Sequence, residues 1–339
     1  MVKEEVIRLW RICFQDSEDF IRFYFDKKYR EENTLTLSEN GQIVSALQML
    51  PYQMTWNGNL IPVSYISGAS TLPEARKKGY MSQLLSKAFG VMKNQKIAFS
   101  ILIPQEDYLY DYYAKTGYVP VFGYTPENYY LPVKYTHKQV EILSSQKCFS
   151  SLPELYCYFN RQMLKRPNCV QHTAEDFKII LEDLYLSGGH LILFRHISGE
   201  IGGLAFLQPL PDKLHIGELL ADSEEEKSAL LNTVADQWNK SEIELKTPPR
   251  SGHTIRRGMA RMIDTLQVLG IYAQTHPHRT ILLQLTDEIV PSNSGFYRLK
   301  NGSVFRTDSE VQRPDLQLDI RELTQMVFNY PAFISLMLD

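Results

Sequence analysis

The chain has 339 residues, with 36 Lys and Arg against 39 Asp and Glu, and a formal net charge of −3. Its hydrophobic fraction of 44% is typical of a folded globular protein and excludes a chain that is disordered throughout. The near-neutral charge gives no electrostatic reason to expect nucleic acid or a membrane surface as the main partner. At about 150 residues per domain, the length predicts two or three domains.

The N-terminal segment lacks the apolar core and small-residue cleavage site of a signal peptide, and no apolar run reaches the roughly 18 residues that cross a bilayer. These patterns predict a cytoplasmic protein. The cysteines are scattered without a C-x-x-C pair, so neither a disulfide framework nor a metal site is expected. His276-Pro277-His278 has no third ligand nearby in the sequence and is interpreted as a surface turn.

Helical and strand patterns alternate through the first third of the chain. Residues 3–29 carry apolar side chains at helical spacing. Asn-Gly turns then separate strands expected at 34–38, 42–50, 52–56 and 59–66. The next predicted elements are a strand at 62–72 that ends before Pro73, a helix at 81–92, a strand at 97–103, a helix at 108–115 and a strand at 118–122.

A polar connector at 125–150 precedes a block that repeats this order of elements only weakly. Its predicted helices lie at 151–165, 174–186 and 223–238, and its strands at 190–196, 200–208 and 213–220. Residues 246–254 contain Pro-Pro and Ser-Gly and are expected to form a linker. The last block is predicted to hold a helix at 259–272, strands at 280–286, 295–299 and 303–306, and helices from 320 to the end.

A basic segment at the start of the predicted helix 81–92 has the features of an anion site. Arg76, Lys77 and Lys78 bring positive charge to the positive end of the helix dipole, and Gly79 permits close approach of a bulky anion. A pyrophosphate with a long arm lying along the preceding strand fits this arrangement. Without such a ligand, the same residues would be a solvated charge run.

Two motifs in this region resemble those of GNAT-type N-acetyltransferases. Arg76-x-x-Gly79 is similar to the acetyl-CoA motif of that family, although Met81 fills a position where the family usually has Gly or Ala. Tyr113-Ala-Lys-Thr-Gly117-Tyr118 resembles the Tyr-x-x-x-Gly-Phe/Tyr signature that follows the fifth strand. Both motifs, in this order and separated by strand and helix, indicate acetyl-CoA as co-substrate.

A narrower resemblance, to the Eis (enhanced intracellular survival) branch, covers nearly the whole chain. Residues 258–264 look like the helix that opens its last domain, and Asp287, Pro291, Asn293 and Gly295 look like its Asp…Pro-x-Asn-x-Gly hairpin. The resemblance implies an α/β (α+β) fold in three parts. These are a GNAT domain at 1–135, a second degenerate GNAT-like domain at 136–250 and a sterol-carrier-protein-like domain at 251–339.

The resemblance also implies direct acyl transfer from the thioester to a neutral amine. Tyr113 matches the family's general acid for the departing sulfur, and Asp339 at the C-terminus matches the base, through either its main-chain or its side-chain carboxylate. Backbone N–H groups near Ser70, Thr71 and Leu72 would polarise the carbonyl. The residues expected to bind coenzyme A are Ser70, Thr71, Leu72, Arg76, Lys77, Lys78, Gly79, Tyr80 and Met81.

The sequence leaves the amine open. Eis-type enzymes acetylate aminoglycosides and polyamines, which implies a wide acidic pocket and a homo-oligomer such as a hexamer. Candidate acids for that pocket are Glu18, Asp19, Glu31, Glu32, Glu106 and Asp107. An alternative of another class is a non-catalytic module that responds to coenzyme A or binds lipid through a vestigial transferase site.

Overall fold

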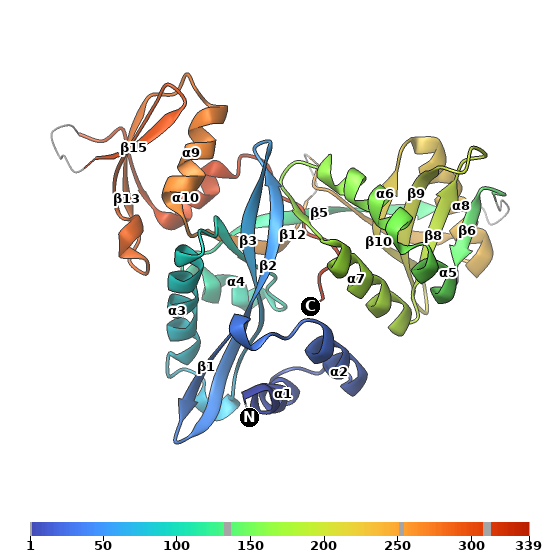
Figure 1. Ribbon diagram of the computed structural model, residues 1–339, viewed down its shortest axis with the longest axis horizontal. Coiled ribbons are helices and arrows are strands. Elements are labelled where there is room, and N and C mark those ends of the chain that lie inside the picture. Colours follow the sequence, from blue (N-terminus) through green and yellow to red (C-terminus); the bar gives the residue numbers. More distant parts are fainter. Residues whose placement is uncertain (1, 132–136, 251–253, 308–312, 339) are drawn as a thin grey trace. The chain divides into compact units, whose positions relative to one another are not determined.

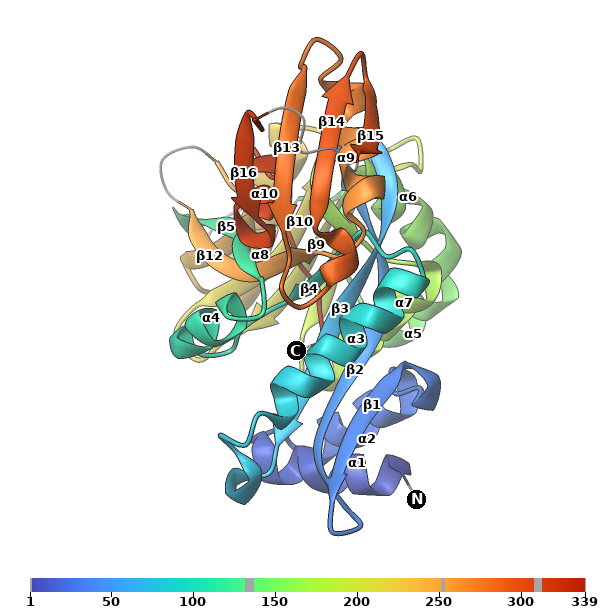
Figure 2. The same cartoon turned by 90° about the vertical axis from the view of Figure 1, so that its left-hand side faces the viewer.

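The computed structural model describes residues 2–131, 137–250, 254–307 and 313–338 (Figures 1 and 2). Internal contacts divide these residues into two compact units, which are treated separately below. The first unit comprises the described residues up to 122 together with those of 257–331, and the second comprises those of 123–256 together with 332–338. The three domain ranges expected from the sequence stay a prediction.

The main sheet of the first unit has the strand order β1-β2-β3-β4-β12. Its strands are β1 (Thr34–Glu39), β2 (Gln42–Trp56), β3 (Asn59–Thr71), β4 (Phe99–Leu102) and β12 (Ile255–Met262). The helices beside it are α1 (Val2–Cys13), α2 (Glu18–Lys27), α3 (Tyr80–Asn94) and α4 (Asp107–Ala114), with 3-10 turns η1 (Glu31–Asn33) and η2 (Pro73–Ala75). Figure 1 shows α1 and α3 on opposite sides of β2 and β3.

Local sequence explains where these elements begin and end. The single helical region predicted at 3–29 is two helices, because the Ser17 side chain accepts a hydrogen bond from the Phe20 N–H and so caps a new helix. The Asn57-Gly58 turn between β2 and β3 holds both residues at positive φ, as a tight hairpin requires. The Leu47 and Met49 side chains of β2 face α3 and share a buried core with it.

Strands β3 and β4 run side by side for a short distance and then separate. They are parallel and paired from Val63 opposite Phe99 to Tyr65 opposite Ile101. Beyond this point β3 continues to Thr71, whereas β4 ends at Leu102. Gly68, with φ +58°, lies in a bulge where the β2–β3 register shifts. The edge of β3 after Tyr65 is therefore unpaired on the β4 side, and the strand itself ends before Pro73, as the sequence predicted.

A smaller sheet with the order β15-β14-β13-β16 completes the first unit. Its strands are β13 (Ile281–Thr286), β14 (Gly295–Lys300), β15 (Ser303–Thr307) and β16 (Leu316–Asp319), and it is accompanied by α9 (Thr265–Thr275), α10 (Ile320–Val327) and the turn η3 (Pro291–Asn293). Strand β16 was not predicted from the sequence, and the helix expected from residue 320 onward ends at Val327. The described residues 328–338 form no further helix.

The helix predicted at 259–272 is wrong over its first part. Residues 259–262 belong to β12 and pair antiparallel with β4, and α9 starts only after Asp264, whose side chain caps it. Consecutive residues of β12 are buried on both faces of the sheet. Because a short strand buried on both faces has no apolar–polar alternation, its sequence resembles part of a buried helix.

The second unit is built on a sheet with the order β5-β11-β10-β9-β8-β6. The strands of this sheet are β5 (Val119–Tyr130), β6 (Val140–Leu143), β8 (His190–Arg195), β9 (Ile201–Pro209), β10 (Leu214–Ala221) and β11 (Glu242–Thr247), β5 beginning in the first unit. The unit also contains the short strand β7 (Cys169–Gln171), which lies outside this order. Its helices are α5 (Ser145–Ser150), α6 (Leu152–Leu164), α7 (Ala174–Leu186) and α8 (Glu224–Trp238). Helices α6 and α7 pack in one core and α8 in another.

The C-terminal segment 332–338 is part of the second unit. The Phe333 N–H donates to the Asn168 carbonyl at 2.8 Å, and the Val170 N–H donates to the Phe333 carbonyl at 3.2 Å. The Ser335 hydroxyl donates to Glu218, which also forms a bidentate ion pair with Arg166. The apolar tail is therefore docked, and it is held by buried polar contacts as well as by packing.

Candidate active site

The separation of β3 from β4 opens a large cavity inside the first unit. Its volume is about 820 Å³, a size typical of small-molecule and cofactor sites. One wall comes from the end of β3 and the loop that follows it, and the other comes from α4 and the segment before it. Of the residues expected to bind coenzyme A, those that line this cavity are Ser70, Thr71, Arg76, Lys77, Gly79, Tyr80 and Met81.

The loop before α3 has the geometry of an anion site. Lys77 and Gly79 both have left-handed backbone conformations, with φ of +65° and +82°. Within the described part of the chain, no side chain caps the N-terminus of α3. The first backbone hydrogen bond of this helix is donated by the Gln83 N–H to the Gly79 carbonyl. The N–H groups of the first turn are therefore available to phosphate oxygens, beside the Arg76 and Lys77 side chains.

Lys78 is directed away from this cavity. Its ammonium lies 3.0 Å from both carboxylate oxygens of Glu39 and forms an exposed ion pair. The Glu39 carboxylate raises the pKa of Lys78, and Lys78 in turn holds the pKa of Glu39 below its usual range. Lys78 does not line the cavity with Arg76 and Lys77, so the structure separates this one of the three predicted cations from its neighbours.

At the end of β3 the structure brings Ser70 and Thr71 to the cavity but not Leu72. The Leu72 N–H donates to the Val44 carbonyl at 2.9 Å, which leaves it no proton for a ligand. The Thr71 carbonyl accepts from Arg76 Nε at 3.2 Å, so the loop folds back on the strand end. Any backbone donor that polarises the thioester carbonyl must therefore come from the unpaired edge of β3 before Leu72.

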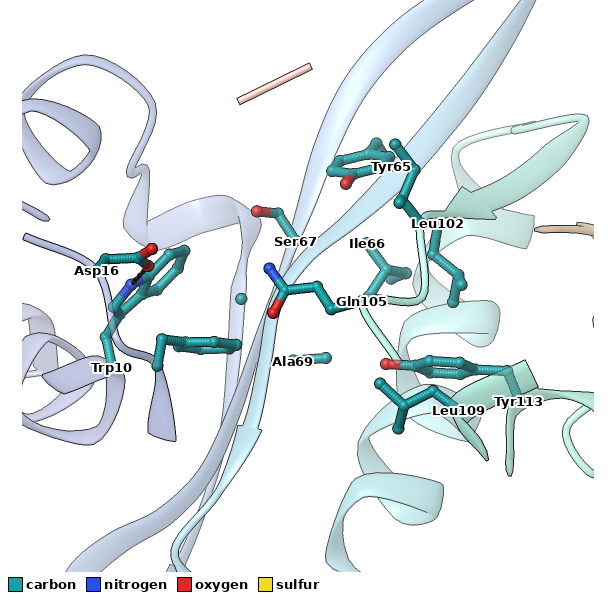
Figure 3. A pocket seen from close by; sticks show the side chains of 13 residues that line it. Trp10, Asp16, Tyr65, Ile66, Ser67, Ala69, Leu102, Gln105, Leu109 and Tyr113 are labelled. Atoms are coloured by element: carbon teal, nitrogen blue, oxygen red, sulfur yellow. Dashed lines mark hydrogen bonds between the residues drawn. The ribbon is translucent and has the colours of Figure 1, made fainter. Parts of the chain in front are cut away.

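Tyr113 on α4 is buried, and its hydroxyl faces the opening between β3 and β4 (Figure 3). No group among the described residues forms a hydrogen bond with that hydroxyl. Its burial, with a smaller contribution from Tyr112 and Tyr108, raises the pKa of Tyr113 well above the usual value of a phenol. The hydroxyl therefore stays protonated at neutral and moderately alkaline pH, as a proton donor must.

A second, smaller cavity of about 80 Å³ is also lined by Tyr113. Five residues line both cavities, and they mark where the two meet: Phe14, Ala69, Gln105, Leu109 and Tyr113. Figure 3 shows Trp10 and Asp16 opposite the Tyr113 ring, across β3. Asp16 is the carboxylate that lines this smaller cavity, and its Oδ2 accepts a hydrogen bond from Trp10 Nε1 at 2.7 Å.

Sequence reasoning missed the contribution of the loop between α1 and α2. Phe14 and Asp16 lie there, and Cys13 and Gln15 line the large cavity beside them. The residues were interpreted as part of one long helix, and only Ser17 followed by an acidic turn signals the break. Of the candidate acids, only Glu106 lines one of these two cavities, and Glu18 forms an ion pair with Arg11.

The predicted base cannot be placed in the same way. Asp339 lies outside the described residues. Among the residues that are described, no group of three or more His, Cys, Asp or Glu side chains has the arrangement of a metal site. Over the same part of the chain, no helix is both long enough and apolar enough to cross a membrane.

Family comparisons agree with this geometry. Residues 3–121 match the acetyltransferase (GNAT) domain family, and residues 262–338 match the sterol carrier protein domain family. The chain therefore contains a GNAT acetyltransferase domain and, toward its C-terminus, a sterol carrier protein domain, and it is an acyltransferase. The expected fold class and the resemblance on which it rested are thereby confirmed. No curated protein matches this acyltransferase in sequence.

Several solved structures have the same fold over nearly the whole acyltransferase. A probable N-acyltransferase from Enterococcus faecalis V583 has a TM-score of 0.77 at 16% identity, covering 95% of this chain and 86% of that one. Eis1 from Mycobacterium abscessus has a TM-score of 0.73 at 14% identity, with 97% and 86% coverage. A GCN5-related N-acetyltransferase from Anabaena variabilis has a TM-score of 0.72 at 16% identity, with 98% and 96% coverage. The acyltransferase thus shares the fold of an Eis protein.

Proposed function

We propose that this acyltransferase moves an acetyl group from acetyl-CoA to a primary amine. The observation that carries the proposal is that Tyr113 lines two cavities, one of them large and the other small. The large cavity has an anion-binding loop at one end, so it suits the pyrophosphate and the arm of coenzyme A. The small cavity then receives the end of the acceptor that carries the amine.

The chemistry that this arrangement supports is a direct transfer. The nitrogen of a neutral amine attacks the thioester carbonyl carbon, a new C–N bond forms and the C–S bond breaks. Tyr113 gives its proton to the departing sulfur, and the proton lost by the nitrogen passes to a carboxylate. Holding both reactants in one cleft supplies the proximity that such a reaction needs.

The coenzyme is proposed to lie along the loop and the strand end. Arg76 and Lys77 would offset the charge of the pyrophosphate, and the N–H groups at the start of α3 would bind its oxygens. Ser70, Tyr80 and Met81 line the same cavity and would contact the arm. Thr71 lies there too, but its carbonyl and hydroxyl already have partners within the fold.

The proposed acceptor is a cationic amine of the aminoglycoside or polyamine class. Asp16 is exposed at the small cavity and is oriented by Trp10, so it can bind an ammonium group of the acceptor next to the one that reacts. The narrowness of this cavity favours an amine at the end of a slender arm. The C-terminal carboxylates of Asp339 are proposed as the base, by analogy with Eis enzymes.

Two measurements on the full chain test this proposal. Acetyl-CoA at 100-fold over its dissociation constant should stabilise the fold by about 2.7 kcal/mol in a thermal shift assay. A panel of amines, including spermidine and kanamycin, should release coenzyme A thiol above the rate of hydrolysis. Stabilisation without transfer to any amine would favour the non-catalytic alternative, and no stabilisation at all would refute the proposed coenzyme.

Variants at the two proposed catalytic positions separate their roles. Tyr113→Phe should lower kcat by about 10²–10⁴-fold, the usual contribution of a general acid, and leave the affinity for acetyl-CoA unchanged. Removal of Asp339 should also lower kcat, and an undiminished rate would exclude the C-terminus as the base. We further propose a cytoplasmic homo-oligomer, whose size light scattering of the purified chain would measure.

A further inference from the structure

Arg261 is a fully buried arginine at the centre of the first unit, on β12. Its Nε donates to the Thr116 carbonyl at 2.8 Å, its Nη1 to the Met262 carbonyl at 2.8 Å and its Nη2 to Asp287 Oδ1 at 2.7 Å. The guanidinium also lies 4.4 Å from the centre of the Phe89 ring on α3. A buried charge is costly unless its partners are well oriented, so these contacts fix the side chain in one position.

The partner carboxylate is itself held from several sides. Asp287 Oδ1 accepts a hydrogen bond from the Val290 N–H at 3.0 Å, and Oδ2 accepts one from Asn293 Nδ2 at 2.9 Å. The other end of the Asn293 amide accepts from Lys93 Nζ, on α3, at 2.6 Å. These hairpin residues, 287–295, belong to the segment that matches the sterol carrier protein family, residues 262–338, called the sterol carrier segment below. They orient Arg261 and connect it to α3, the helix that begins at the proposed coenzyme site.

Through its Nε, Arg261 reaches the backbone that follows Tyr113. The Thr116 N–H and hydroxyl both donate to the Tyr113 carbonyl, each at 2.9 Å, while the Thr116 carbonyl accepts from Arg261. A Cβ on Gly117, which has φ +90°, would lie 2.8 Å from Arg261 Nε. Glycine at this position thus permits the close approach of the guanidinium to the end of α4.

The ring of Tyr113 is also connected to Arg261, through contacts with other aromatic rings. Its centroid lies 5.8 Å from that of Tyr118, at an interplanar angle of 68°, and the Tyr118 ring lies 5.8 Å from that of Phe89. Phe89 is the ring beneath the Arg261 guanidinium. The Tyr118 hydroxyl is fixed at 2.6 Å from Ser100 Oγ on β4. The backbone of Tyr113 is therefore bonded to a residue that Arg261 binds, and its ring is connected to Arg261 through Tyr118 and Phe89; the Tyr112 ring also packs on it, at 5.3 Å.

The geometry points to Arg261 as a positioning residue for Tyr113, with the sterol carrier segment as the support that holds it. The inference rests on the proposed role of Tyr113 as the general acid. The Tyr113 hydroxyl has no partner of its own among the described residues, so its place is set by the backbone and ring contacts alone. A displacement of about 1 Å at a reacting group can lower a rate by about 100-fold.

Arg261→Lys tests the inference because it keeps the charge opposite Asp287 but removes the Nε–H bond to Thr116. We expect kcat for the fastest acceptor of the amine panel to fall by about 10–100-fold, while the affinity for acetyl-CoA stays within about twofold. The decisive measurement is a double-mutant cycle with Tyr113→Phe. If Arg261 acts through Tyr113, the double variant should have the same kcat as Tyr113→Phe alone.

A matched control lies in the same segment. Tyr272 is also fully buried, and its hydroxyl accepts a hydrogen bond from Arg279 Nη1 at 2.8 Å, but it contacts neither Arg261 nor Tyr113 in any interaction described above. Tyr272→Phe should lower the melting temperature and leave kcat unchanged. Should Arg261→Lys not fold, the isosteric Thr116→Val variant removes the hydroxyl contact to Tyr113 and should show the same non-additive loss of kcat.

The outcomes separate this inference from the proposed function. An unchanged kcat in folded Arg261→Lys, or a loss that multiplies with that of Tyr113→Phe, would overturn the positioning role and leave the acid in place. An unchanged kcat in Tyr113→Phe would overturn the acid and the inference together. A fall of kcat in Tyr272→Phe equal to that in Arg261→Lys would also overturn it, because general destabilisation would then explain both.

Discussion

Gly79→Ala tests the loop before α3, because its effect on the stability of the fold can be measured separately from its effect on the binding of acetyl-CoA. Gly79 has φ +82° and ψ 7°, and a Cβ placed on it would meet nothing within 4 Å. The substitution therefore creates no clash in the protein itself. Its cost to the fold is the left-handed conformation alone, about 1 kcal/mol, or about 2–4 °C in melting temperature for a unit of this size.

The open space beside Gly79 is where the proposed pyrophosphate would approach the backbone. An alanine methyl group there should push the phosphate away from the N–H groups of the first helical turn, and we expect the dissociation constant of acetyl-CoA to rise by about tenfold or more, equivalent to about 1.4 kcal/mol or more. Isothermal titration calorimetry with acetyl-CoA measures this change, and a thermal scan without ligand measures the stability.

Gly58→Ala is the matched control. Gly58 lies in the β2–β3 turn of the same unit with φ +72°, and its Cβ would also meet nothing within 4 Å. The Gly58→Ala variant should lose about as much stability as Gly79→Ala and should keep the affinity of the unsubstituted chain for acetyl-CoA. Equal affinities for Gly79→Ala and the unsubstituted chain, with a normal loss of stability, would refute the placement of the pyrophosphate at this loop.

Three further predictions concern other parts of the molecule. Asp16→Asn should raise KM for a cationic amine by about tenfold, since it removes a charged hydrogen-bond acceptor, and steady-state kinetics with unchanged acetyl-CoA affinity would check it. Glu218→Gln should destabilise the second unit by about 3–5 kcal/mol, because the ion pair between buried Glu218 and half-buried Arg166 is broken; urea unfolding measures this, and a change below about 1 kcal/mol would contradict it. Burial raises the pKa of Tyr24 and Tyr113, so their contribution to stability is fully present below about pH 10. This contribution to stability should be lost as the pH rises from the unfolded pKa of about 10 toward the higher pKa values of the folded protein, because the unfolded chain releases these protons first. An unfolding free energy that stays constant from pH 9 to 11 would count against this prediction.

Most of the elements that form the site were predictable from local sequence. The strand that ends before Pro73, the amphipathic helix after Gly79 and the short buried strand at 99–102 all have strong periodicity or strong turn residues. The Arg76-x-x-Gly79 loop was placed correctly at the start of that helix. Local patterns succeed here because each element is fixed by residues within about one or two turns of it.

Errors occurred where tertiary contacts decide the conformation. Residues 259–262 form a strand because β4 offers them an edge, and nothing in their own order of apolar residues shows that partner. Lys78 has the same charge as its two neighbours, but it forms an ion pair with Glu39, at the end of β1, and does not line the cavity. Asp16 reaches the small cavity because α1 and α2 fold across β3, and a local pattern does not specify that packing.

By itself, the sequence determined the kind of chemistry: a glycine that permits a left-handed turn, cations at a helix start and a tyrosine followed by Gly-Tyr are local features with direct physical meaning. Only the tertiary structure decided that Tyr113 lies where two cavities meet and that Arg261, almost 150 residues later in the chain, holds the end of its helix. The reason is that a buried charge selects its partners by distance in space, and the burial that makes such a contact strong exists only after distant segments have packed together.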